Sequence, residues 1–227
     1  MKNKFYILFA LLALGVISCD LGDDPVDGGT ATEAIAGEYF AQLLDAPGGS
    51  VYVDYSLITI SNTAANTTDQ IRIKDDGNIW GFNSVVNVDL ATLTFSSDTV
   101  INDAYDKPEA SPYKPIGTID TIGSVPKYMV IKDGRVFPGV AHVPSLTTAD
   151  SIAFYATGVY KLSAYQVVAW DIDTITLDPL EIDTLSVFQF VEELPHPDYA
   201  TPDGPYFLSG YRRTGFLEDE HLSLIHI

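Results

Sequence analysis

Short runs of β-branched and aromatic residues, separated by turn residues, recur along most of this 227-residue chain. The run from Val51 to Ile60 mostly alternates in polarity, which is the period of a half-buried strand. Turn residues follow at intervals of roughly eight to twelve positions, a spacing typical of β-sandwiches and β-barrels. The sequence therefore predicts an all-β fold. Further strands are predicted over Val85–Phe95, Ser151–Thr157, Gln166–Thr176, Asp183–Val191 and Tyr206–Thr214.

Two glycine-containing turns predict β-hairpins. Asp133-Gly134 separates two β-rich runs, and an Asp-Gly pair supplies the two positive φ values of a type I′ turn. Asp75-Asp76-Gly77 predicts a second hairpin, with the returning strand at Asn78–Trp80. Only Thr32–Leu44 has the apolar spacing of a helix, and a glycine in its middle disfavours one. The proline-containing stretches 103–115 and 193–205 are predicted to be loop insertions.

The N-terminus has the order of an export signal. Two lysines precede an apolar run from Phe5 to Ile17, and Ser18 and Cys19 follow it. This run is too short to span a bilayer, which requires roughly 20 helical residues. Cys19 is the only cysteine in the chain, so the folded part is expected to be stable without a disulfide.

The run Val16-Ile17-Ser18-Cys19 resembles the lipobox of bacterial lipoproteins. The resemblance implies a diacylglyceryl group on the Cys19 thiol, cleavage before this residue, and acylation of the new amine. Two or three acyl chains would anchor the protein stably in a membrane, which is therefore an expected partner. The alternative interpretation is an ordinary signal peptide, or a short signal anchor, with a chance cysteine.

Charge and composition divide the chain into four predicted segments. Residues 1–18 are the signal peptide, and residues 19–33 form a flexible acidic tether because they contain few large apolar side chains. Residues 34–221 form the barrel domain. Residues 222–227 resemble a translated sequencing adapter, although a native tail is the alternative.

The mature chain is strongly acidic. The sequence leaves more than one interpretation of its location in the cell envelope. Removal of residues 1–18 leaves 10 basic and 31 acidic residues, a net charge of −21, which excludes nucleic acid as a partner. The acidic cluster after Cys19 resembles an export signal to the outer face of the outer membrane. Asp20 alone resembles an inner-membrane retention signal, and a plain solvated linker is the third interpretation. We expect a cell-envelope, outer-membrane lipoprotein that faces the exterior.

The end of the barrel domain carries a family resemblance. Residues 209–216, Ser-Gly-Tyr-Arg-Arg-Thr-Gly-Phe, resemble the closing strand of a family of Gram-negative lipoproteins described as lipid-binding putative hydrolases. Gly37-Glu38-Tyr39, Asn62-Thr63-Ala64 and residues 150–154 agree with the same pattern. The resemblance implies a single antiparallel lipocalin-like (calycin) up-and-down barrel of about eight or more strands with loop insertions, expected to be monomeric.

Calycins pack an arginine of the last strand over an aromatic ring of the first. The resemblance therefore implies that Gly37 and Tyr39, together with Arg212 or Arg213, close the barrel, with Tyr39 where the family pattern usually has Trp. A guanidinium over a ring contributes about 0.5–2 kcal/mol. The alternative is that both arginines are ordinary solvated strand residues.

Hydrolase chemistry has little support in the sequence. The chain has no Gly-x-Ser-x-Gly motif, and lipidation would consume its cysteine. His142, with a serine and an aspartate brought together by the fold, is the only candidate for a triad, and an ordinary strand or loop histidine is the alternative. No metal site or cofactor is expected, because the aspartate pairs present do not fit the spacing of a calcium loop.

Binding of a small apolar or amphiphilic molecule, without catalysis, is the function that the sequence favours. A barrel of about eight strands encloses side chains or one small ligand. Two alternatives stay open, a hydrolase that uses His142 and a surface adhesion or glycan-handling module. Aromatic residues on predicted strands line the expected pocket or simply fill the core; they are Tyr39, Tyr55, Trp80, Phe82, Phe154 and Phe188.

A triplet of aspartate, a hydroxyl residue and an aliphatic residue occurs five times. It resembles an O-glycosylation signal of exported proteins in some Gram-negative bacteria. Strand alternation with solvent-facing hydroxyls explains the same triplets without a sugar. The five hydroxyl residues are Thr99, Thr121, Ser151, Thr174 and Thr184.

Overall fold

The computed structural model describes residues 29–173 and 183–216. All regular structure described lies within the unit Ala31–Ile227. Every regular element of the described ranges is a strand, and no helix there is long and apolar enough to cross a membrane. The strands are β1 (Gly37–Leu44), β2 (Val51–Asn62), β3 (Gln70–Lys74), β4 (Asn83–Asp89), β5 (Thr94–Ser96), β6 (Thr99–Ile101), β7 (Ile119–Ile122), β8 (Tyr128–His142), β9 (Thr148–Val159), β10 (Lys161–Asp173), β11 (Asp183–Pro195) and β12 (Asp203–Arg212).

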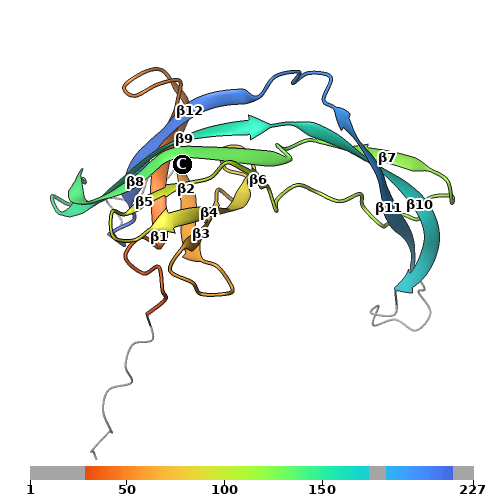
Figure 1. The fold of residues 1–227 in the computed structure, drawn as a ribbon, viewed down its shortest axis with the longest axis horizontal. Helices are drawn as coiled ribbons and strands as arrows, with labels where there is room; N and C mark the ends of the chain where they lie inside the picture. Colours follow the sequence, from red (N-terminus) through yellow and green to blue (C-terminus); the bar gives the residue numbers. More distant parts are fainter. Residues whose placement is uncertain (1–28, 174–182, 217–227) are drawn as a thin grey trace, which may run out of the picture. The chain divides into compact units, whose positions relative to one another are not determined.

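Eight of these strands form a closed antiparallel barrel. Around the ring they follow the order β1-β2-β3-β4-β5-β8-β9-β12, and β12 pairs with β1 to complete the circle. Figure 1 shows β12, in blue, returning beside β1, in orange. The ring strands follow one another in chain order, with insertions after β5 and after β9, so the barrel is of the up-and-down type. The all-β prediction and the predicted barrel are therefore confirmed.

The barrel interior is filled by alternate side chains of every ring strand. Because neighbouring residues of a strand face opposite sides, one set of side chains points inward. Tyr39, Phe154 and Met129 are among the largest of these; together with Phe82, which directly precedes β4, each is at most 1% exposed. Isoleucines occupy much of the remaining interior, at Ile58, Ile60, Ile71, Ile73, Ile131 and Ile152.

The insertions of the barrel carry a second sheet. Strands β7, β10 and β11 pair antiparallel in the order β11-β10-β7, outside the ring. β7 lies between β6 and β8 in the chain, and the β10–β11 hairpin lies between β9 and β12. The predicted insertions at 103–115 and 193–205 therefore cover only parts of two longer excursions.

Lys127 fastens this outer sheet to the barrel. Its Nζ lies 2.8 Å from Glu193 Oε2 and 2.9 Å from Ser163 Oγ, on β11 and β10. Three aromatic rings surround the same ammonium group, and their centroids lie 5.2–5.7 Å from it. Cation–π contacts with a desolvated ammonium group are stronger than exposed ones, so this cluster is expected to hold the two sheets together. The rings belong to Tyr105, Tyr128 and Phe190.

The predicted Asp133-Gly134 hairpin is wrong. β8 runs without interruption from Tyr128 to His142, and the pair forms an irregularity in its register with β9. Gly134 is needed for a close approach instead, because a Cβ there would lie 2.3 Å from the Phe95 ring. The glycine thus lets β5 pack directly on β8.

The structure also decides two other local patterns. Residues 32–36 form a turn closed by hydrogen bonds to the Thr32 carbonyl oxygen, and β1 starts at Gly37, so the helix that Gly37 disfavours does not form there. Tyr39 and Ala41 both point into the core, which is the period of a strand. Asp75-Asp76-Gly77 does form a turn, but the returning strand starts at Asn83, and Asn78–Trp80 lies in the connecting loop.

Candidate functional site

The six aromatic residues predicted for a pocket are distributed over four environments. Tyr39, Phe82 and Phe154 lie in the packed interior. Tyr55 lies on the outer barrel surface, where its ring centroid is 5.7 Å from that of Tyr211. Phe188 belongs to the outer sheet, with the Lys114 ammonium group 5.9 Å from its ring centroid. Trp80, the sixth, lies at one end of the barrel.

Trp80 belongs to a group of aromatic side chains that we call the aromatic rim. The rim comprises Tyr52, Trp80, Tyr160, Tyr199 and Tyr206. The Tyr206 ring makes edge contacts with Trp80 at 5.1 Å and with Tyr52 at 5.4 Å. The Tyr160 and Tyr199 rings stack at 3.9 Å. These residues lie at the end of the barrel where β2 and β12 begin and where β9 ends.

The rim is apolar on the side that faces the core and open to solvent on the other side. Trp80 and Tyr206 pack against the interior core, whereas Tyr52 is 61% exposed and Tyr199 is 39% exposed. Aromatic rings that join a buried core to water are typical of surfaces that hold molecules with apolar and polar parts. The rim can therefore accept an apolar chain on a surface continuous with the core.

A buried carboxylate sets the position of Trp80. Asp75 is fully buried, and its two oxygens accept backbone hydrogen bonds from the loop that follows it. The donors include the amides of Ile79 (3.1 Å), Gly81 (2.9 Å) and Phe82 (2.8 Å). A carboxylate that satisfies several amides fixes the loop conformation, and with it the indole ring that the loop carries.

A hydrogen bond between Tyr206 and Asp203 places polar groups at the centre of the rim. The Tyr206 hydroxyl donates to Asp203 Oδ1 at 2.9 Å. This bond to Asp203, together with burial, raises the pKa of Tyr206 to about 12. Burial, then the neighbouring Tyr199 and Asp203, also raises the pKa of Tyr160. Both phenols are neutral at physiological pH, so the rim presents hydroxyl groups and one carboxylate to a ligand.

At the opposite end of the barrel, Arg212 lies across the joint between β1 and β12. Its Nη1 lies 2.9 Å from Asp150 Oδ2, its Nη2 donates to the Ala36 carbonyl oxygen, and its guanidinium carbon lies 5.9 Å from the Tyr39 ring centroid. Gly37 makes room for it, because a Cβ there would lie 2.7 Å from Arg212 Nε. Arg213 faces the other way and pairs with Glu38 at 2.6 Å.

His142 is the histidine predicted for a triad. It is exposed at the end of β8, opposite Thr148 in the register with β9. Ser151 lies opposite Phe137 in the same register, and its hydroxyl donates to the Gly210 carbonyl oxygen at 3.0 Å. The nearby Ser145 shares a hydrogen bond with Thr147.

The remaining predicted positions differ in accessibility. Thr99 and Thr121 are exposed, whereas Ser151 and Thr184 are half-buried. Cys19 and Thr174 lie outside the described residues. Of the residues that the structure describes, no three His, Asp or Glu side chains gather as potential metal ligands.

Sequence reasoning missed most of the rim. Tyr52 and Tyr206 lie at strand ends, and Tyr199 and Tyr160 flank the outer sheet, so no strand period connects them. The density of tyrosine near the proline-containing stretch 193–205 was the one available signal. An open groove of about 790 Å³ beside β7 was also not predicted. Its lining includes the charged residues Lys107, Lys114 and Asp120, so it suits an apolar chain less well than the aromatic rim does.

Comparison with known proteins agrees with this geometry. No curated protein matches the chain. A family model described as lipid-binding putative hydrolase matches residues 24–217, which include the whole barrel and the outer sheet. The chain therefore belongs to the lipid-binding putative hydrolase family, with the eight-stranded barrel as its fold.

Proposed function

We propose that this protein is a lipid-anchored lipoprotein of the cell envelope that binds an amphiphilic small molecule at the aromatic rim without transforming it. The main observation that supports this proposal is the rim itself, a surface of exposed rings continuous with the apolar core. Membership of a lipid-binding family supports the same ligand class. The acidic mature chain favours a neutral or zwitterionic headgroup over an anionic one.

The packed interior supports a ligand position at the rim rather than in the lumen. Side chains as large as Tyr39, Phe82 and Phe154 already occupy the lumen and are at most 1% exposed. Close-packed protein interiors leave few voids larger than a water molecule. A bound chain is therefore expected to lie along Tyr52, Trp80 and Tyr206, with its headgroup toward solvent.

The anchor is proposed on the sequence alone. The lipobox-like run that ends at Cys19 and the acidic residues after it support an acylated N-terminus, a tether and a position at the outer membrane that faces the exterior. Binding without chemistry is supported by the surroundings of His142, which is exposed while the Ser151 hydroxyl is bonded to a backbone carbonyl.

A surface adhesion module is the second candidate, and one observation favours it. The outer sheet leaves several large apolar side chains exposed to solvent, with Trp170 at 51% and Ile172 at 56%. Exposed apolar groups that cluster on one sheet are typical of interaction surfaces. This candidate places the ligand or partner on β10 and β11 rather than at the rim.

The two tryptophans of the chain separate these candidates, because Trp80 lies at the rim and Trp170 on the outer sheet. We suggest titrating a chain-brominated lysophosphatidylcholine, below its micelle concentration, into Trp170→Phe and Trp80→Phe proteins while recording fluorescence. The rim proposal predicts saturable quenching of Trp80 and little quenching of Trp170. Quenching of Trp170 alone would favour the outer sheet, and no saturable quenching of either would contradict amphiphile binding.

A further inference from the structure

One section of the barrel wall is built differently from the rest. β5 pairs with β4 on one side and with β8 on the other, but only over residues 94–96. The next strand, β6, pairs with β8 at residues 99–101 and forms no ladder with β4 in the described chain. The first half of β4, from Asn83 to Val86, therefore faces β6 across a seam without paired strands.

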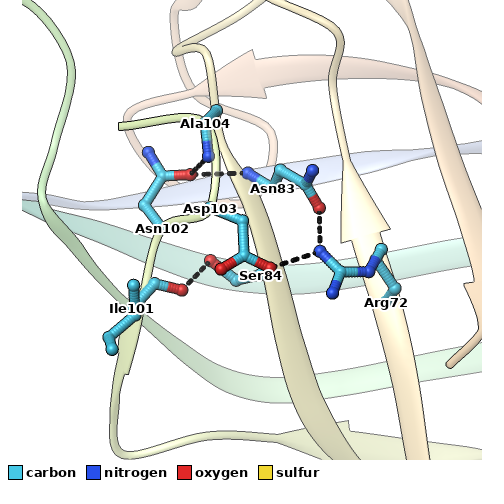
Figure 2. A network of polar contacts seen from close by, with 7 residues as sticks. All are labelled: Arg72, Asn83, Ser84, Ile101, Asn102, Asp103 and Ala104. Carbon is cyan, nitrogen blue, oxygen red and sulfur yellow. Dashed lines mark hydrogen bonds and ion pairs between the residues drawn. The ribbon is translucent and has the colours of Figure 1, made fainter. Parts of the chain in front are cut away.

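Side chains close this seam in place of a backbone ladder (Figure 2). Asn102, which is 1% exposed, accepts at Oδ1 from the Asn83 amide (2.7 Å) and the Ala104 amide (3.1 Å). The Ser84 hydroxyl donates to the Ile101 carbonyl oxygen at 3.1 Å. One backbone bond, from the Asp103 amide to the Asn83 carbonyl oxygen at 2.7 Å, crosses at the same level.

Arg72, on β3, adds a further contact across the seam. Its Nη1 lies 2.6 Å from Asn83 Oδ1 and 2.6 Å from Asp103 Oδ2, so one guanidinium group joins both sides of the seam. Rotations of a few side chains can open contacts of this kind, whereas a strand ladder opens only by breaking several backbone bonds together. The seam is thus a section of the wall that can open without breaking a strand ladder.

The seam is also connected to the aromatic rim. The Asn102 amide group donates to the Gly81 carbonyl oxygen at 3.0 Å and to the Pro126 carbonyl oxygen at 2.7 Å. Gly81 directly follows Trp80 in the chain, and Pro126 packs against Gly158, two residues before Tyr160. One side chain therefore joins the segment that carries Trp80 to a segment that packs against the end of β9, two residues before Tyr160.

The residues behind the seam are apolar. Phe82 and Val86 belong to the interior core, and Val100 of β6 packs against it. Opening of the seam would expose a strip of core directly beside Trp80. A strip bounded by two extended strands fits an unbranched hydrocarbon chain, which can lie parallel to them, better than a fused-ring lipid.

We propose that the β4–β6 seam is the entrance through which the acyl chain of a rim-bound amphiphile reaches the barrel core, and that Asn102 is the positioning residue that keeps it closed. This inference rests on the proposed function, because it assigns a route and a chain type to the same ligand. The chain reaches the core only at its edge, because opening of the seam would uncover Phe82, Val86 and Val100 beside the rim.

The sharpest test is Asn102→Asp in the full chain carrying Trp170→Phe. The substitution keeps the size and the Oδ1 acceptor, but it replaces the amide donors by a carboxylate that faces the Gly81 and Pro126 carbonyl oxygens. Stopped-flow quenching of Trp80 by brominated lysophosphatidylcholine should then show association about tenfold faster, the factor that corresponds to about 1.4 kcal/mol. Native-state hydrogen exchange of the Asn83 and Asp103 amides, which bond across the seam, should accelerate, whereas exchange across β1 and β12 should not.

Two further variants keep the test interpretable. Asn62→Asp makes the same chemical change at the other end of the barrel, where Asn62 donates to the Thr63 carbonyl oxygen, and it should leave the association rate unchanged. Ser84→Ala removes one seam bond without adding charge and should act in the same direction as Asn102→Asp if the latter fails to fold.

The outcomes separate the entrance from the proposed function. If the Trp170→Phe protein alone shows no saturable quenching, amphiphile binding at the rim is wrong, and the entrance falls with it. If that protein binds the probe but Ser84→Ala and Asn102→Asp leave its association rate unchanged while seam exchange accelerates, the rim proposal stands and the entrance is refuted.

Discussion

Replacing Arg212 by alanine should destabilise the barrel far more than the same change at Arg213. Arg212 joins three groups at the joint of β1 and β12, namely the Asp150 carboxylate at 2.9 Å, the Ala36 carbonyl oxygen and the Tyr39 ring. Arg213 makes an ion pair with Glu38, whose side chain is 43% exposed.

The expected magnitudes follow from these contacts. Hydrogen bonds to a charged group contribute about 1.5–3 kcal/mol, and a partly exposed ring contact adds about 0.5–1 kcal/mol. The Arg212 side chain is 31% exposed and that of Asp150 is 23% exposed, so solvent screening reduces the ionic part. We expect Arg212→Ala to lower the free energy of unfolding by about 1–3 kcal/mol. Arg213→Ala should cost at most about 0.5 kcal/mol, as exposed pairs do.

Urea denaturation followed by circular dichroism would measure both values. A double-mutant cycle with Tyr39→Leu should give a coupling of about 0.5–1 kcal/mol between the ring and Arg212. Gly37→Ala should cost less in the Arg212→Ala background than alone, because the conflict with Arg212 Nε is then gone. Equal small losses for the two arginines, or strict additivity of Tyr39→Leu and Arg212→Ala, would refute the assignment of Arg212 as the residue that stabilises the closure.

Three further predictions concern other parts of the chain. Cys19→Ala should leave an unprocessed, non-lipidated precursor, and membrane fractionation with intact-mass measurement would check this; a variant that partitions into detergent at the mature mass would contradict the anchor. Protein from its native host should carry hexose-scale additions at the exposed Thr99 and Thr121 rather than at Ser151, whose hydroxyl is bonded, and peptide mapping that finds unmodified threonines would leave strand alternation as the explanation. Burial raises the pKa of Tyr39 to about 12, and the Asp203 hydrogen bond does so for Tyr206, so both favour the neutral phenol in the folded state. Their contribution to stability should therefore be complete below pH 10.0, the ordinary value, and should fall as pH rises toward about 12; Tyr206→Phe should flatten this decline in urea titrations at increasing pH.

The barrel could be predicted because its local signals and its packing agree. Residues such as Ile58, Ile60, Ile71 and Ile73 alternate in the sequence, and the same residues alternate into the core. The Asp133-Gly134 hairpin failed because a glycine that permits a turn also permits close approach of another strand, and only the Phe95 ring distinguishes the two uses.

The site was harder to predict for a geometric reason. Tyr39 lies opposite Arg212 in the β1–β12 register, and this register decides which arginine faces inward, yet it depends on the two ends of the barrel domain meeting. The aromatic rim likewise collects residues from strand ends and from an insertion. Asn102 carries no sequence signal at all, because its four partners come from three separate segments that only the fold brings together.

The position of β12 as the last strand of the ring has a consequence for how the molecule assembles. Before β12 arrives, β1 and β9 are the open edges of a seven-stranded sheet, and β12 then forms ladders with both in one step. Unpaired edges are templates for strands of other molecules, so the nascent chain is most prone to aggregate in this interval. The same geometry makes the barrel suited to split complementation. A fragment that ends before Asp203, mixed with a peptide of residues 203–213, should be completed by strand donation between two edges.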